Sequence, residues 1–304
     1  MGFRILGHRG NGRTDNGDLS AGKAPENTLL SFEQAIDNGA HGVEFDIIKS
    51  KDGVAMVTHK PQINGQNLAD LTADEIQKID LGYGQHVPTL DEALLLIISK
   101  QSNDPDKKLT INIDLKGPNV SKATAEVINR YTEEGLIDNE QVYYNAIDWR
   151  KLVVVRDYDS DAQIVPVLTT GFLFGESNVQ KPDFHVEDDV KYDPNNMKSL
   201  IYFIKEYRPT AIDMVLADIR PEMFDLMDEN GIGLITTPIG PKREEAAKRI
   251  FNIVAMIGEY AQRSPIFVAM RTDDIAEGRI LSDNPITDRR ESIERIMGAP
   301  FIKL

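Results

Sequence analysis

The sequence contains no cysteine, a single tryptophan and no long apolar run. Without cysteine, the chain has no disulfide framework, no thiolate metal site and no cysteine nucleophile. Its longest apolar stretch, at 93–98, is far shorter than the roughly 20 residues that cross a bilayer, so we expect no stable membrane insertion. The opening sequence MGFRILGHRG lacks the apolar region of a signal peptide. We therefore predict a cytoplasmic protein.

Positive charge is also scarce. The chain has 34 Lys and Arg against 49 Asp and Glu, which gives a net charge of −15 and a pI near 4.8. Proteins that bind nucleic acid or anionic membranes need a positive surface, so we expect neither partner. A small phosphate ester can still bind if a few local cations or a bound metal overcome this field. The sequence gives no indication of the oligomeric state.

Strand-like and helix-like segments alternate over the 304 residues, which is typical of parallel βαβ units. Eight strands fit a closed barrel better than an open sheet. The sequence therefore predicts an α/β protein with a (β/α)8 TIM barrel as a single domain over 1–304. The predicted strands are 4–7, 43–48, 109–115, 142–145, 164–168, 211–216, 233–236 and 279–282. The clearest predicted helices are 28–38, 89–99, 121–134, 221–229 and 244–262.

Three segments depart from this alternation. An additional short strand is expected at 54–59, followed by a long connection at 61–88. A polar segment at 171–196 predicts a long loop insertion, and loops of that length are usually functional or mobile. The seventh strand has two candidates, because 265–274 could supply it in place of 231–240.

Carboxylates line one face of two predicted strands. Glu44 and Asp46 stand two apart in GVEFDI, so they point to the same side. An isolated pair of this kind is more often a solvated strand end. In LTINIDLKG, however, Asn112, Asp114 and Lys116 again share one face near a carboxyl end, where catalysis occurs in barrels. Three carboxylates from two strands suit a hard cation such as Mg²⁺ or Ca²⁺.

Basic and titratable side chains follow other strand ends. His8 and Arg9 come directly after the first strand, and His59 closes the additional strand in VAMVTHK. A lone histidine at such a place is more often structural. Together with the carboxylates and a lysine, these residues are hard to explain as scaffold. Phosphoryl chemistry uses cations for the non-bridging oxygens and imidazoles to move protons.

Four motifs occur in order near the start of the chain: HRG at 8–10, PENTLLSFEQAIDNGA at 25–40, VEFDIIKSKDG at 43–53 and VTHK at 57–60. Their order and spacing resemble the glycerophosphodiester phosphodiesterase family. INIDLK and ILSDNP resemble the E-x-K strand and the closing I-I-T-D-x-P of that family. The resemblance is strong over roughly the first 120 residues and thin afterwards. It implies a barrel that cleaves glycerophosphodiesters to glycerol 3-phosphate and an alcohol, with one divalent metal ion.

The resemblance also implies roles for individual residues, including an orienting role for the glutamate of PENT. The implied acid/base pair is His8 and His59, the metal ligands are Glu44, Asp46 and Asp114, the phosphate contacts are Arg9 and Lys116, and the orienting residue is Glu26.

Two positions differ from the family pattern, and an aromatic strand is missing. Asp114 replaces the usual Glu, Lys60 replaces the usual Asp after the histidine, and the Trp-rich seventh strand is absent. A shorter carboxylate is compatible with a flexible cation site. The other two changes weaken the expectation of a plain glycerol substrate. The alternatives are therefore a sugar phosphodiester or lysophospholipid as substrate, and a binding barrel without catalysis.

Overall fold

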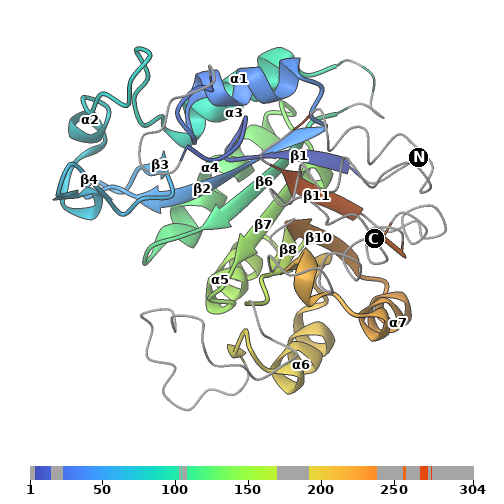
Figure 1. Ribbon diagram of the computed structural model, residues 1–304. Helices are drawn as coiled ribbons and strands as arrows, with labels where there is room; N and C mark the ends of the chain where they lie inside the picture. The colour runs from blue at the N-terminus through green and yellow to red at the C-terminus, as the bar shows by residue number, and fades with distance from the viewer. Residues whose placement is uncertain are drawn as a thin grey trace.

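The computed structural model describes residues 4–14, 23–102, 104, 108–169, 192–237, 256–257, 268–272 and 275. Eight parallel strands surround a common axis with helices outside them (Figure 1). They are β1 (Arg4–His8), β2 (Gly42–Lys49), β6 (Thr110–Leu115), β7 (Val142–Ala146), β8 (Gln163–Pro166), β9 (Ala211–Val215), β10 (Gly233–Thr237) and β11 (Val268–Thr272).

The sheet closes on itself. Its strands follow the order β8-β7-β6-β2-β1-β11-β10-β9, so the path ends at β8 and β9. These two ends meet through a parallel bridge between Val167 and Asp213. The amide of Leu168 donates to the carbonyl of Asp213 at 2.7 Å, and that of Thr210 donates to the carbonyl of Ile164 at 3.0 Å. The predicted (β/α)8 barrel is confirmed.

The eighth strand is not where the sequence patterns placed it. β11 (Val268–Thr272) pairs with β10 on one side and with β1 on the other. It therefore fills the last place in the barrel, and the prediction of an eighth strand at 279–282 is wrong. β10 supplies the seventh strand, so both candidate segments belong to the barrel. The residues 279–282 themselves lie outside the described part of the chain.

Six helices of the described chain cover the outside of the barrel. The strands present alternate residues to them, such as Val43, Phe45 and Ile47 of β2, which are fully buried in the main core. Local caps start the helices: the hydroxyl of Thr28 accepts from the amide of Ser31 at 3.3 Å at the start of α1. The helices are α1 (Leu29–Asp37), α3 (Leu90–Lys100), α4 (Val120–Glu133), α5 (Arg150–Tyr158), α6 (Met197–Tyr207) and α7 (Pro221–Asn230).

Four of the five predicted helices correspond to α1, α3, α4 and α7. The fifth, at 244–262, lies outside the described residues except for 256–257. The same holds for the predicted loop insertion at 171–196, of which only 192–196 is described. The single tryptophan, Trp149, is fully buried against Phe203 with ring centroids 5.2 Å apart. It therefore belongs to the core of the barrel.

A small excursion from the barrel, residues 55–76, follows β2. The predicted additional strand is β3 (Ala55–Val57), which pairs antiparallel with the end of β2. Beyond it come β4 (Gln62–Ile63), β5 (Gln66–Asn67), a 3₁₀ turn (Leu68–Asp70) and α2 (Ala73–Ile76). The excursion has its own apolar cluster, which includes Met56, Leu68 and Ile76. It therefore forms a packed wall at the carboxyl end of β2, at the left of Figure 1.

The inside of the barrel has an apolar layer and a polar layer. Leu6, Tyr143, Val165, Ala211, Ile235 and Ala269 form a separate buried cluster. Two residues further along several of these strands the inward positions become polar, as at His8, Asn145 and Asp213. No helix in the described ranges is long and apolar enough to span a bilayer.

Candidate active site at the carboxyl ends of the strands

Three buried carboxylates meet between β2 and β6. Glu44 stands opposite Asn112 and Asp46 opposite Asp114 in the parallel register, so all four point into the barrel. Glu44 and Asp46 are each 1% exposed and Asp114 is 6% exposed. One oxygen from each of the three acids lies within 4.8 Å of the others. The predicted metal ligands are therefore brought together.

The turn after β1 brings Arg9 over these acids. Arg9 adopts the left-handed conformation (φ 53°), and Gly10 follows with φ 89°. A β-carbon on Gly10 would lie 2.5 Å from the hydroxyl of Ser31, so only glycine fits. The turn directs the amide of Arg9 to Glu44 Oε2 at 2.9 Å. Its guanidinium Nε lies 3.4 Å from Asp46 Oδ2.

The PENT segment holds this arrangement from the side. Glu26 accepts from Arg9 Nη1 at 2.9 Å with one oxygen and from the amide of Thr14 at 2.9 Å with the other. Asn27 donates from Nδ2 to Asp46 Oδ2 at 3.0 Å, and its Oδ1 accepts from the Asp46 amide at 3.2 Å. The sequence analysis predicted an orienting role for Glu26 and missed Asn27. Its position in the same motif was the available signal.

Lys116 leaves the end of β6 and returns to the acids. Its Nζ lies 2.5 Å from Asp114 Oδ2 and 3.4 Å from Asp46 Oδ1. Burial would lower the pKa of Lys116, but the charges of Asp114 and Asp46 outweigh it and raise that pKa above its ordinary value. Lys116 is therefore held as a cation beside two carboxylates.

The two predicted histidines lie at the edge of this cluster. His8 Nε2 is 4.0 Å from Glu44 Oε2, and its side chain is mostly buried. His59 follows β3 and is half-buried. Burial lowers the pKa of His59 below 6.5, the neighbouring charge of Asp46 opposes this change, and Arg9 and Lys116 reinforce it. The imidazole of His59 is therefore suited to be neutral near pH 7.

A chain of polar side chains continues across the inside of the barrel. Arg271 of β11 contacts Glu44 Oε1 at 3.4 Å and Asp213 Oδ2 at 2.5 Å. Asp213 also accepts from Asn145 at 2.6 Å, and Asn145 accepts from Asn112 at 2.5 Å. The sequence analysis missed Arg271, Asp213 and Asn145. A single charged or amide residue in each of the otherwise largely apolar strands VAMRT, AIDMV and VYYNA was the signal.

The neighbouring cations and hydrogen bonds stabilise the negative charges of the three carboxylates unequally. Burial and the charges of Asp46 and Asp114 raise the pKa of Glu44, although His8 and Arg271 oppose the change. For Asp46, burial is outweighed by Lys116, His59, Arg9 and the Asn27 hydrogen bond, and these lower its pKa. Asp114 Oδ1 is buried with no hydrogen-bond partner among the described residues. An orphaned carboxylate oxygen beside two further carboxylates fits a hard divalent cation.

Together, the eight-stranded barrel and the buried acids, cations and imidazoles at its strand ends define a (β/α)8 protein with an acidic centre. All eight predicted site residues belong to this centre or its edge. A sequence profile of the glycerophosphoryl diester phosphodiesterase family matches residues 8–201, which is more than half of the chain and includes all eight. The chain belongs to that family.

Individual relatives agree with this assignment. A glycerophosphodiester phosphodiesterase of Caldanaerobacter subterraneus subsp. tengcongensis is 30% identical over 166 residues, which are 49% of this chain and 62% of that protein. The chain spans about half the length of the curated relatives it matches.

Solved structures support the fold over nearly the whole chain. A glycerophosphodiester phosphodiesterase from Thermotoga maritima has a TM-score of 0.58 at 20% identity and covers 92% of this chain and 99% of its own. An Oleispira antarctica phosphodiesterase, solved with the product sn-glycerol-3-phosphate, has a TM-score of 0.63 at 14% identity. The match covers 93% of this chain and 98% of that protein. At these identities the likeness concerns the fold alone.

Proposed function

We propose that the protein hydrolyses a glycerophosphodiester to glycerol 3-phosphate and an alcohol. The observation that carries this proposal is the cluster of Glu44, Asp46 and Asp114, whose oxygens lie within 4.8 Å, with cations and imidazoles around it. Membership of the family and the product complex of the Oleispira antarctica phosphodiesterase support the choice of substrate.

The three acids would hold one divalent cation, Mg²⁺ or Ca²⁺. Bound there, the cation supplies Lewis-acid stabilisation of charge on the phosphate oxygens. The donor set is all oxygen, which suits these two ions. Asn27 fixes the orientation of Asp46 through its two hydrogen bonds, and Arg271 contacts Glu44 Oε1 at 3.4 Å. These contacts keep the ligand oxygens in place.

Arg9 and Lys116 would bind the phosphate of the substrate. Both lie against the acids, and Glu26 fixes the guanidinium of Arg9. A planar guanidinium and a compact ammonium at one site can contact two non-bridging oxygens. Because the net charge of the protein is −15, these local cations are needed to hold an anion.

His59 and His8 would move the protons. The lowered pKa of His59 leaves a neutral imidazole that can accept a proton from the attacking hydroxyl, which belongs to water or to a neighbouring group of the substrate. In the second case the first step forms a cyclic phosphodiester, and water then opens it to glycerol 3-phosphate in a second displacement. The new phosphorus–oxygen bond forms in line with the bond that breaks to the leaving alcohol. His8, on the Glu44 side of the cluster, would donate a proton to the leaving oxygen.

Hydrolysis of glycerophosphocholine, glycerophosphoglycerol and an aryl phosphodiester tests the proposal, with Mg²⁺, Ca²⁺ or EDTA. We expect metal-dependent release of glycerol 3-phosphate from the two glycerophosphodiesters. Asp114→Asn should reduce kcat by about a hundredfold or more, because it removes a charged ligand from the buried cluster. Asp74→Asn is the matched control, since Asp74 is exposed on α2. Equal turnover with EDTA, or no product with any metal and substrate, would contradict the proposal.

A further inference from the structure

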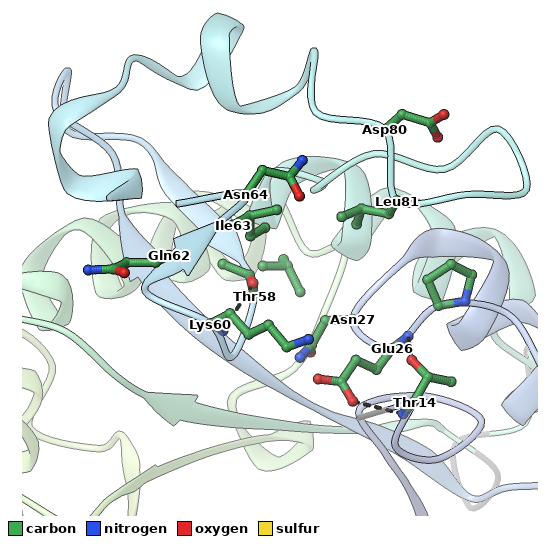
Figure 2. Close-up of a pocket in the computed structure, with 12 residues that line it drawn as sticks. Thr14, Glu26, Asn27, Thr58, Lys60, Gln62, Ile63, Asn64, Asp80 and Leu81 are labelled. Atoms are coloured by element: carbon green, nitrogen blue, oxygen red, sulfur yellow. Dashed lines mark hydrogen bonds between the residues drawn. The ribbon is translucent and has the colours of Figure 1, made fainter. Parts of the chain in front are cut away.

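A pocket of about 370 Å³ lies beside the acidic centre, between the PENT segment and the excursion after β3 (Figure 2). This volume falls within the range of sites that bind small molecules. Its walls are mixed, with apolar side chains beside polar ones. The polar lining that matters here is Glu26, Asn27, Thr58, Lys60, Gln62 and Asn64.

The pocket shares a wall with the acidic centre. Glu26 lines the pocket and holds the guanidinium of Arg9 at 2.9 Å. Asn27 lines it and holds Asp46 through two hydrogen bonds. A diester whose phosphate lies against Arg9 and the acids can therefore extend one of its two alcohols into this space.

Lys60 gives the pocket a local positive charge. Among the described residues that line the pocket it is the one cation, and no ion pair of its ammonium occurs in the described part of the chain. Figure 2 shows its side chain extending across the pocket toward the side of Asn27 and Glu26. The Lys60 amide donates to the hydroxyl of Thr58 at 3.2 Å, which anchors the base of this side chain.

Neither of the two acids in the lining forms an ion pair with Lys60 in the described part of the chain. Both oxygens of Glu26 already accept hydrogen bonds, from Arg9 and from the amide of Thr14. Asp80 accepts from the amide of Gly82 at 2.8 Å, and in Figure 2 it lies across the pocket from Lys60 with its carboxylate turned away. The ammonium of Lys60 is thus the charged donor available to a bound alcohol.

We propose that this pocket receives one of the two alcohols of the diester and that Lys60 selects alcohols that carry a negative charge, either a phosphate or a carboxylate. The inference rests on the proposed function and specifies its substrate class. The mean field of a chain with net charge −15 repels a second negative charge, so selection of an anion needs a local cation. Lys60 provides that cation next to the reacting phosphate.

Matched diesters test this selection. Glycerophosphoglycerol is the neutral reference, bis(glycerophospho)glycerol adds a phosphate, glycerophosphoglycerate adds a carboxylate, and glycerophosphocholine adds a positive charge. We expect kcat/KM for the anionic diesters to exceed that for the neutral one by roughly three- to tenfold, as for a charge-assisted contact at a partly exposed site. The phosphate and carboxylate substrates then show which anion is preferred.

Variants connect the preference to Lys60. Lys60→Met keeps the apolar stem and should abolish the preference, and Lys60→Glu should reverse it toward glycerophosphocholine. Lys78→Met removes the charge of another exposed lysine that is not part of the pocket lining and should leave the preference unchanged. A preference that persists in Lys60→Met, or a wild type without preference, overturns the inference.

Binding separates this inference from the proposed reaction. Calorimetric titration of the same diesters into the His59→Asn variant reports affinity without turnover. If the wild type hydrolyses nothing, the proposed function fails, and the titration still decides the role of the pocket. Tighter binding of the anionic diesters that disappears in the double variant with Lys60→Met supports the inference, and equal affinities for all four overturn it.

Discussion

Asp114 is one methylene shorter than the glutamate that the family pattern has at this position, and the site accommodates the difference. One of its oxygens accepts a hydrogen bond from the ammonium of Lys116 at 2.5 Å, and the other is buried without a hydrogen-bond partner among the described residues. Despite its shorter side chain, it lies within 4.8 Å of the ligand oxygens of Glu44 and Asp46. The substitution of Asp for Glu is therefore compatible with the three-carboxylate site that the sequence predicted.

His59 leads to a prediction on pH. Burial, then Arg9 and Lys116, lower its pKa below 6.5, while Asp46 opposes them. A cation on Asp46 would remove that largest opposing contribution, so the direction holds with metal bound. Protonation at low pH removes the proton acceptor. We therefore expect kcat/KM to fall with decreasing pH along a limb centred below 6.5, measured at saturating metal.

Substitution of His59 tests the same assignment. His59→Asn should lower kcat by about a hundred- to ten-thousandfold, the range of general acid–base catalysis. His86→Asn is the control, because His86 is a partly exposed histidine that contacts Glu92. The control should keep both the rate and the acidic limb. A limb centred above 6.5, or a His59→Asn variant with near-normal turnover, argues against His59 as the proton acceptor.

At the scale of elements, the start of α3 carries a prediction on stability. Thr89 and Glu92 form a reciprocal capping box, with the Thr89 hydroxyl accepting at 3.2 Å and the Glu92 carboxylate at 2.8 Å. α3 buries Leu90, Leu94 and Ile97 in the main core. Thr89→Ala should therefore lower the free energy of unfolding by about 1 kcal/mol, measured by urea denaturation.

The excursion offers a matched control for this cap. Thr72 and Glu75 form the same box at α2, but this helix has only four residues and its cap is exposed. Thr72→Ala should cost less than Thr89→Ala, because α2 can fray without exposing the barrel core. An equal or larger loss in Thr72→Ala would show that the excursion and the barrel unfold as one unit.

Local alternation explains how much of the site the sequence could predict. In GVEFDI and LTINIDLKG the acids alternate with apolar residues, and the structure places the two sets on opposite faces because strand side chains alternate. Glu44, Asp46 and Asp114 could thus be identified from periodicity. The turn that brings Arg9 back to Glu44 depends on φ values at Arg9 and Gly10 that periodicity does not encode.

Nonlocal pairing explains what the sequence could not predict. β11 takes the eighth place in the barrel because it pairs with β1, more than 250 positions earlier in the chain. Both 265–274 and 279–282 have strand-like composition, so composition alone does not choose between them. The position of Arg271 beside Glu44 follows from that pairing and was invisible for the same reason. Asn27 is a further case, since its contact with Asp46 joins two separate elements.

For the molecule as a whole, the acidic centre concentrates charge of one sign inside a chain that is already acidic. Glu44, Asp46, Asp114 and Asp213 are all buried. Arg9, Lys116 and Arg271 are the cations that contact them. Burial raises the pKa of Asp213 even though Arg271 opposes the change. The folded protein therefore holds buried carboxylates whose repulsion a divalent cation would reduce.

Metal binding should consequently stabilise the whole fold. A cation that binds only the folded state at a hundredfold excess over its Kd adds about 2.7 kcal/mol to the free energy of unfolding, which raises Tm by several degrees for a chain of this size. We expect this rise with Mg²⁺ or Ca²⁺, measured by differential scanning calorimetry against EDTA-treated protein. Asp114→Asn should lose most of it, because it removes the negative charge of one of the three ligands, and Asp74→Asn should keep it. An unchanged Tm for the wild type at millimolar metal would mean that the three carboxylates do not form a metal site, whatever the enzyme hydrolyses.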